Sequence, residues 1–64
     1  MREWLKHLRE AAELSQDEVA KQAGISQSYY AAIETGERGD KLPVPTAKKI
    51  ADVLRFDWQQ FYSE

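Results

Sequence analysis

The chain has 64 residues, which is enough for one domain and not for two. It contains no cysteine, so a disulfide framework and a thiolate metal site are excluded. No apolar run is long enough for a signal peptide or a membrane-spanning helix, so we expect a cytoplasmic protein with no membrane partner. Nine basic and eleven acidic residues give a net charge of −2. Small nucleic-acid-binding domains are more often basic, so the charge balance alone argues against nucleic acid as the ligand.

The apolar pattern predicts an all-α fold of five short helices. Their predicted ranges are residues 3–13, 16–23, 27–35, Thr46 or just before it to Arg55, and Trp58 to about Tyr62. Leu5, Leu8 and Ala12 recur at helical spacing and support the first helix. Ser15 and Glu18 match a capping box, in which each side chain can bond the other's backbone amide, and so mark the start of the second helix.

The connection between the second and third helices is very short and consists of Gly24, Ile25 and Ser26. The glycine permits a sharp change of direction, and Ser26 is a typical N-cap residue for the third helix. Ile25 is expected to point into the core, and Ala20 is small enough to let the two helices approach closely. This pattern is typical of a helix-turn-helix, which presents its second helix outward. Such a helix fits the major groove of DNA.

Several segments together carry a resemblance to a known family: Leu14–Ala20, Ala23–Tyr30, Ile33–Gly36, Thr46–Ala51 with Leu54, and Phe56–Trp58. The chain resembles the phage repressor and Cro-type helix-turn-helix regulators, the XRE family, over nearly all its length. The resemblance implies one compact repressor-like domain over residues 1–64. It also implies a sequence-specific double-stranded DNA-binding regulator, a repressor from a phage or mobile element that binds a pseudo-palindromic operator as a homodimer.

The resemblance further implies which residues contact DNA. Family members touch a phosphate or a flanking base with the residue that begins the second helix, which is Gln16 here. They read bases with the first turn of the third helix, which holds Gln27 and Ser28 behind the cap residue Ser26. A glutamine amide can donate to and accept from adenine in the major groove. Ala32 matches a further base-reading position, where it can contact only a thymine methyl group.

Other positions near the third helix allow two interpretations. Tyr30 matches a core position of the family. Tyr29 either contacts a sugar or phosphate of DNA or covers the edge of the core. Arg38 and Lys41 follow the third helix, and they either reach the DNA backbone or are solvated loop charges.

Two further expectations concern structure and assembly. The family often pairs a basic residue in the first helix with a glutamate near the end of the third, so the resemblance implies a partly buried ion pair between Arg9 and Glu34 that does not touch DNA. Aromatic residues are also dense near the carboxyl end, and a domain of this size cannot easily bury all of them together with Trp4. The candidate residues for a self-association patch are Phe56, Trp58, Phe61 and Tyr62.

Nothing in the sequence supports catalysis, a cofactor, a metal ion or a small-molecule ligand. His7 is the single histidine and has no expected partner, and the adjacent Asp17 and Glu18 point in different directions on a helix. The alternative function is a helix-turn-helix that binds a protein, such as an antitoxin-like or accessory partner. The polar Gln27 and Ser28 disfavour this alternative, because a protein-binding face would carry large apolar residues there.

Overall fold

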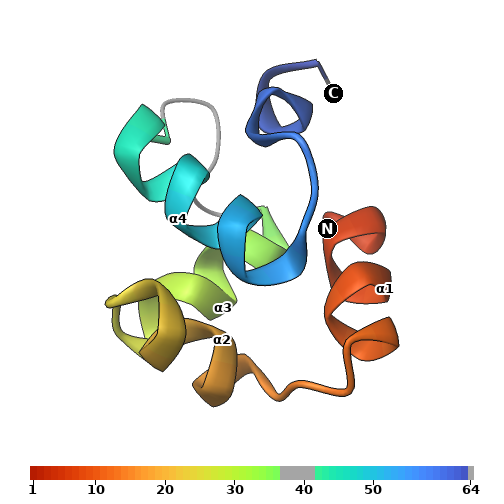
Figure 1. Ribbon diagram of the computed structural model, residues 1–64, viewed down its shortest axis with the longest axis vertical. Helices are drawn as coiled ribbons and strands as arrows, with labels where there is room; N and C mark the ends of the chain where they lie inside the picture. The colour runs from red at the N-terminus through yellow and green to blue at the C-terminus, as the bar shows by residue number, and fades with distance from the viewer. Residues whose placement is uncertain (37–41, 64) are drawn as a thin grey trace.

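The computed structural model describes residues 1–36 and 42–63. In order, these residues form α1 (Glu3–Ala11), α2 (Gln16–Ala23), α3 (Gln27–Thr35), α4 (Val44–Leu54) and the 3-10 helix η1 (Trp58–Tyr62) (Figure 1). No strand is present in the described part of the chain. The predicted all-α helix-turn-helix class is confirmed. The count of five helices is slightly off, because the last segment is a 3-10 helix and not an α-helix.

Two helices end earlier than the apolar pattern predicts. α1 stops at Ala11 because Glu13 adopts a left-handed conformation with φ 59°, and the Leu14 amide then donates to the Arg9 carbonyl at 3.2 Å. α4 stops before Arg55, which is left-handed with φ 61°. Glutamate and arginine adopt this conformation much less readily than glycine, so the residue types do not mark these two ends.

α2 and α3 begin at side-chain caps, and the turn between them begins at a left-handed glycine. Ser15 Oγ accepts from the Glu18 amide at 3.1 Å, and the Glu18 carboxylate accepts from the Ser15 amide at 2.9 Å. Ser26 Oγ accepts from the Tyr29 amide at 3.1 Å. Gly24 has φ 74°, a conformation in which any side chain would be strained. These local features turn the chain within the few residues that separate α2 from α3.

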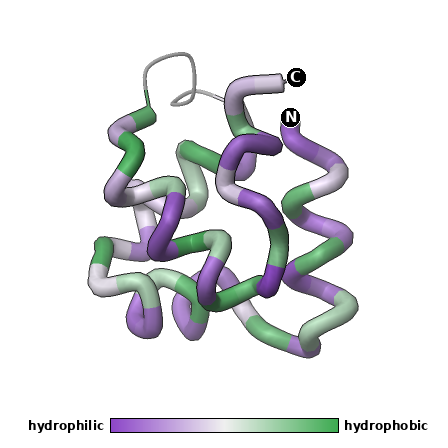
Figure 2. The backbone as a smooth tube through the Cα atoms, turned by 45° about the horizontal axis from the view of Figure 1, so that its top comes forward, coloured by the Kyte–Doolittle hydropathy of each residue, from purple (hydrophilic) through white to green (hydrophobic). Residues whose placement is uncertain are grey.

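The core is shared by all the helices, and α2 packs against both α3 and α4. Figure 2 shows hydrophobic and hydrophilic residues alternating along α1, as expected for a helix with one buried face. The buried apolar residues are Leu5, Val19, Ala20, Ala23, Tyr30, Ile33, Leu42, Ala47, Ile50, Ala51, Leu54 and Phe61. Among the described residues, no helix has the length and apolar character needed to cross a membrane.

An aromatic cluster joins α1 to the carboxyl-terminal segment and closes the core. The ring centroids of Trp4 and Phe56 lie 5.3 Å apart, as do those of Trp4 and Phe61, all in edge-to-face contact. Phe61 is only 3% exposed, so its assignment to a surface patch is wrong: the ring is used to fill the core. Phe56 and Trp58 are half-buried, and Tyr62 is 44% exposed.

Candidate nucleic-acid interface

α3 has one face in the core and another in solvent. Tyr30, Ile33 and Glu34 are buried, whereas Gln27 and Ser28 in the first turn are exposed. The amides of Gln27 and Ser28 belong to the first turn, where a helix has no internal partner for its N–H groups. The amino-terminal end of α3 therefore presents two polar side chains and two main-chain donors at the surface.

The other predicted contact positions on α3 are less exposed. Tyr29 is half-buried and packs against the core, which agrees with the interpretation that it covers the core edge. Ala32 is half-buried, and its carbonyl accepts from Thr35 Oγ1 at 3.1 Å. Arg38 and Lys41 lie outside the described residues, so the two interpretations of these residues stay open.

A buried ion pair ties α1 to α3. Arg9 Nε donates to Glu34 Oε2 at 2.8 Å, and Arg9 Nη2 donates to Oε1 at 3.1 Å, so the contact is bidentate. The side chains are 13% and 2% exposed. Arg9 Nη1 also donates to the Leu14 carbonyl at 2.9 Å, beside the start of α2. The pair therefore holds three consecutive helices in a defined orientation.

Gln16, the first residue of α2, belongs to the same network. Its side chain is half-buried, and Nε2 donates to Glu34 Oε1 at 3.2 Å. Gln16, for which the family resemblance implies contact with a DNA phosphate or a flanking base, is thus also bonded to a buried carboxylate. Neither the local spacing of residues nor the family resemblance indicates this contact between two helices.

The network keeps Glu34 ionised. Burial alone would raise the pKa of this carboxyl. The Arg9 guanidinium, the adjacent Tyr30 hydroxyl and the Gln16 amide together outweigh burial, so the pKa lies below its ordinary value. The hydrogen bond to Glu34 raises the pKa of the Arg9 guanidinium. Both groups are therefore charged at neutral pH.

The phenol of Tyr30 lies next to this network. It is the one buried side-chain polar group in the described residues that makes no hydrogen bond of standard geometry. Burial, together with the nearby Glu34 carboxylate, raises the pKa of Tyr30 far above its ordinary value. Tyr30 is therefore neutral in the folded chain.

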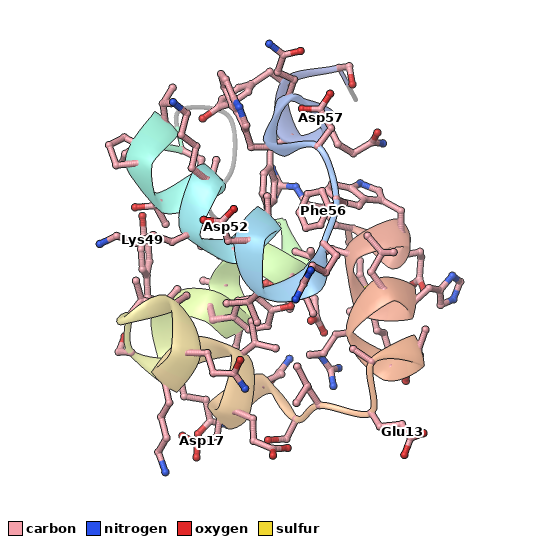
Figure 3. The ribbon with its side chains drawn as sticks, in the orientation of Figure 1. Glu13, Asp17, Lys49, Asp52, Phe56 and Asp57 are labelled. Atoms are coloured by element: carbon pink, nitrogen blue, oxygen red, sulfur yellow. The ribbon has the colours of Figure 1, made fainter. Side chains whose placement is uncertain are left out.

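Positive charge is scarce around the α2–α3 turn. Between residues 15 and 36 the single basic residue is Lys21, and its ammonium lies 3.3 Å from the Asp17 carboxylate. In Figure 3 Asp17 and Glu13 both point away from the body of the molecule near the start of α2 and the end of α1. No group of His, Asp or Glu side chains in the described residues could hold a metal ion.

Arg2 is buried against the end of α3, and the sequence pattern does not predict this burial. It is 7% exposed, and its guanidinium donates to the Ile33 carbonyl near the end of α3. A basic residue close to a chain terminus is ordinarily solvated, so a single sequence carries no signal for its burial.

The helix-turn-helix family pattern matches residues 5–61. The chain is 45% identical to an uncharacterized HTH-type transcriptional regulator, YqaF of Bacillus subtilis (strain 168), over all of this chain and 82% of that protein. It is 38% identical to a second one, RghRB of the same organism, over 86% of this chain but only 39% of that longer protein. No solved structure matches. With a family match over nearly the whole chain and a relative of similar length, the chain belongs to the XRE-type helix-turn-helix family, whose relatives here are HTH-type transcriptional regulators.

Proposed function

We propose that the chain is a sequence-specific double-stranded DNA-binding transcriptional regulator that represses by placing α3 in the major groove of a pseudo-palindromic operator. One observation carries the proposal: the first turn of α3 is exposed and polar, while the opposite face of the same helix is buried. Family membership supports it, because both relatives are HTH-type transcriptional regulators.

In this proposal Gln27 reads an adenine with its amide, and Ser28 contacts a neighbouring base. Ser26 holds the start of α3 through its cap on the Tyr29 amide, and the main-chain donors of the first turn face a phosphate. Ala32 can add only an apolar contact with a thymine methyl group. Gln16, Arg38 and Lys41 are assigned to the DNA backbone. Tyr29 covers the core edge, and its exposed part is assigned to a neighbouring sugar or phosphate.

The proposal also includes a homodimer. Two-fold association would present two copies of α3 about one DNA turn apart. Tyr62 is 44% exposed and Val44 is 41% exposed, and Trp58 is half-buried beside Tyr62 with the ring centroids 5.9 Å apart. These apolar side chains support association through the carboxyl-terminal segment and the start of α4.

Few lysine or arginine side chains are expected to neutralise phosphates in this complex. The ammonium of Lys21 is paired with Asp17, and that of Lys48 lies 5.2 Å from the Trp58 ring centroid. Since the salt dependence of binding follows the number of phosphates neutralised, the slope of log K against log salt should be shallow. A slope as steep as about −10 would contradict this charge distribution.

The test is selection of bound duplexes from a random pool by the purified chain, followed by sequencing and footprinting. Enrichment of a pseudo-palindrome with half-site centres about 10 base pairs apart, or a multiple of that, is the expected result. An unrepeated half-site bound by one chain would contradict the dimer alone. If no duplex is enriched, the DNA-binding proposal fails, and the protein-binding alternative takes its place.

A further inference from the structure

The Glu34 carboxylate accepts hydrogen bonds from two side chains at once. Both oxygens of its carboxylate accept from Arg9, and Oε1 also accepts from Gln16 Nε2. The carboxylate lies inside the domain, whereas Gln16 is half-exposed at the first position of α2. The hydrogen bond between Gln16 and Glu34 therefore connects the buried ion pair to the surface.

The charge on Glu34 decides which way the Gln16 amide is turned. An ionised carboxylate can only accept hydrogen bonds, so the NH2 end of the amide, and not its oxygen, must face it. One N–H of the Gln16 amide therefore donates to Glu34. The second N–H and the amide oxygen make no hydrogen bond within the described residues.

We propose that Glu34 and Arg9 are positioning residues for Gln16: the ion pair holds the amide so that its second N–H is presented to a phosphate oxygen of bound DNA. This inference rests on the proposed function. Arg9 has two tasks in it, because its guanidinium keeps Glu34 ionised and also offsets a negative charge that would otherwise repel the phosphate.

Positioning before binding has a measurable consequence. A glutamine that is free in solution must be ordered when it reaches a phosphate, whereas a glutamine already held by Glu34 has lost most of that freedom. The ordering cost of one such side chain corresponds to about a two- to tenfold change in affinity. The gain exists only when Gln16 and the ionised Glu34 are both present.

The experiment is a double-mutant cycle on binding to the selected duplex, with Gln16→Ala, Glu34→Gln and the double variant. Glu34→Gln keeps the shape of the side chain but lets either end of the Gln16 amide face it. We expect Glu34→Gln to weaken binding by about two- to tenfold when Gln16 is present and to have no effect in the Gln16→Ala background. Gln22→Ala, which removes an exposed glutamine from the same helix, is the matched control.

Binding is measured at a temperature at which circular dichroism shows every variant folded. If Glu34→Gln weakens binding equally in both backgrounds, Glu34 acts only on the fold and the positioning role is overturned. If the wild-type chain binds no duplex, the proposed function itself fails, which is a different result from binding without coupling.

A second measurement needs no variant to fold. Nitrogen-15 relaxation of the side-chain amides of the wild-type chain without DNA should show that the Gln16 amide is restricted. The Gln22 amide should move freely, with an order parameter below about 0.6. Equal mobility of the two amides would overturn the inference whatever the binding cycle gives.

Discussion

The Arg2 guanidinium donates a hydrogen bond to the Ile33 carbonyl at 2.5 Å, so the start of the chain caps the end of α3. The Arg2 amide also donates to the Glu34 carbonyl at 2.8 Å. Both carbonyls belong to the last turn of α3, where the regular helical N–H partners run out. The Ile33 carbonyl also accepts from the Gly36 amide at 3.3 Å. A positive charge at this end is also favourable to the helix dipole. Arg2 therefore stabilises the helix that the proposed function places in the major groove.

Arg2→Met should lower the free energy of unfolding by about 1 to 3 kcal/mol, because a buried carbonyl loses a charged donor. Methionine keeps most of the length of the side chain and can still pack against Phe61, whose ring centroid lies 5.4 Å from the guanidinium carbon. The measurement is urea unfolding at neutral pH. The control is Lys49→Met, which removes the same charge from an exposed side chain. Lys49 is labelled at the left of Figure 3. Equal loss in the two variants would mean that only net charge matters.

Local features of this fold could be predicted from the sequence. The cap at Ser15, the cap at Ser26 and the left-handed Gly24 depend on residues within a few positions of one another. Local hydrogen bonds and backbone preferences determine such features, so the residue types are sufficient to predict them. The ranges of α2 and α3 follow from these same positions.

Contacts between distant segments could be predicted only in part. The Arg9–Glu34 pair is implied by family resemblance, whereas the Gln16 bond to Glu34 and the burial of Arg2 are not. Phe61 is the clearest error, because counting aromatic residues does not tell which ring fills the space beside Trp4. Each of these outcomes depends on how the helices pack, and no periodicity along the chain encodes it.

Glu34 should make the fold sensitive to acid. Its pKa is lowered on folding, so the unfolded chain takes up a proton more readily, and stability falls as the pH falls. The contribution of Glu34 is present above its ordinary pKa of 4.5 and is lost as the pH drops through the lower folded value. We therefore expect the wild type to be more stable than Glu34→Gln at neutral pH, with a difference that shrinks in acid.

Urea unfolding of both proteins from neutral pH down to about pH 2 measures that difference. Glu10→Gln, which changes an exposed carboxyl on α1, controls for the loss of one negative charge and should keep the acid dependence of the wild type. A difference between wild type and Glu34→Gln that stays constant into strong acid would contradict a lowered pKa for Glu34.

Tyr30 should govern the alkaline limit of stability. Burial raises the pKa of its phenol, so the unfolded chain loses this proton first, and stability falls as the pH rises above the ordinary value of 10.0. When the folded chain holds one proton more than the unfolded chain, the free energy of unfolding falls by up to about 1.4 kcal/mol for each pH unit. Tyr30→Phe should remove this loss, and it should cost little at neutral pH because the hydroxyl has no partner of standard geometry.

Thermal unfolding of both proteins between neutral pH and about pH 11 measures this effect, with Tyr62→Phe as a control that keeps Tyr30. A large loss of stability in Tyr30→Phe at neutral pH would show that the phenol donates to Glu34 in solution.

Gln27 is the residue on which base reading depends most directly. Its side chain is exposed in the first turn of α3, so Gln27→Ala should leave the melting temperature nearly unchanged. It should weaken binding to the selected operator by roughly 1 to 3 kcal/mol and reduce the preference at one base pair in each half-site. Non-specific binding should hardly change, because no charge is removed.

The measurement is a titration of both proteins against the operator and its single-base variants, with Gln59→Ala on η1 as a control for loss of an exposed glutamine. If Gln27→Ala weakens binding to all variants equally, Gln27 only positions the DNA backbone, and base reading rests on Ser28, Tyr29 or Ala32.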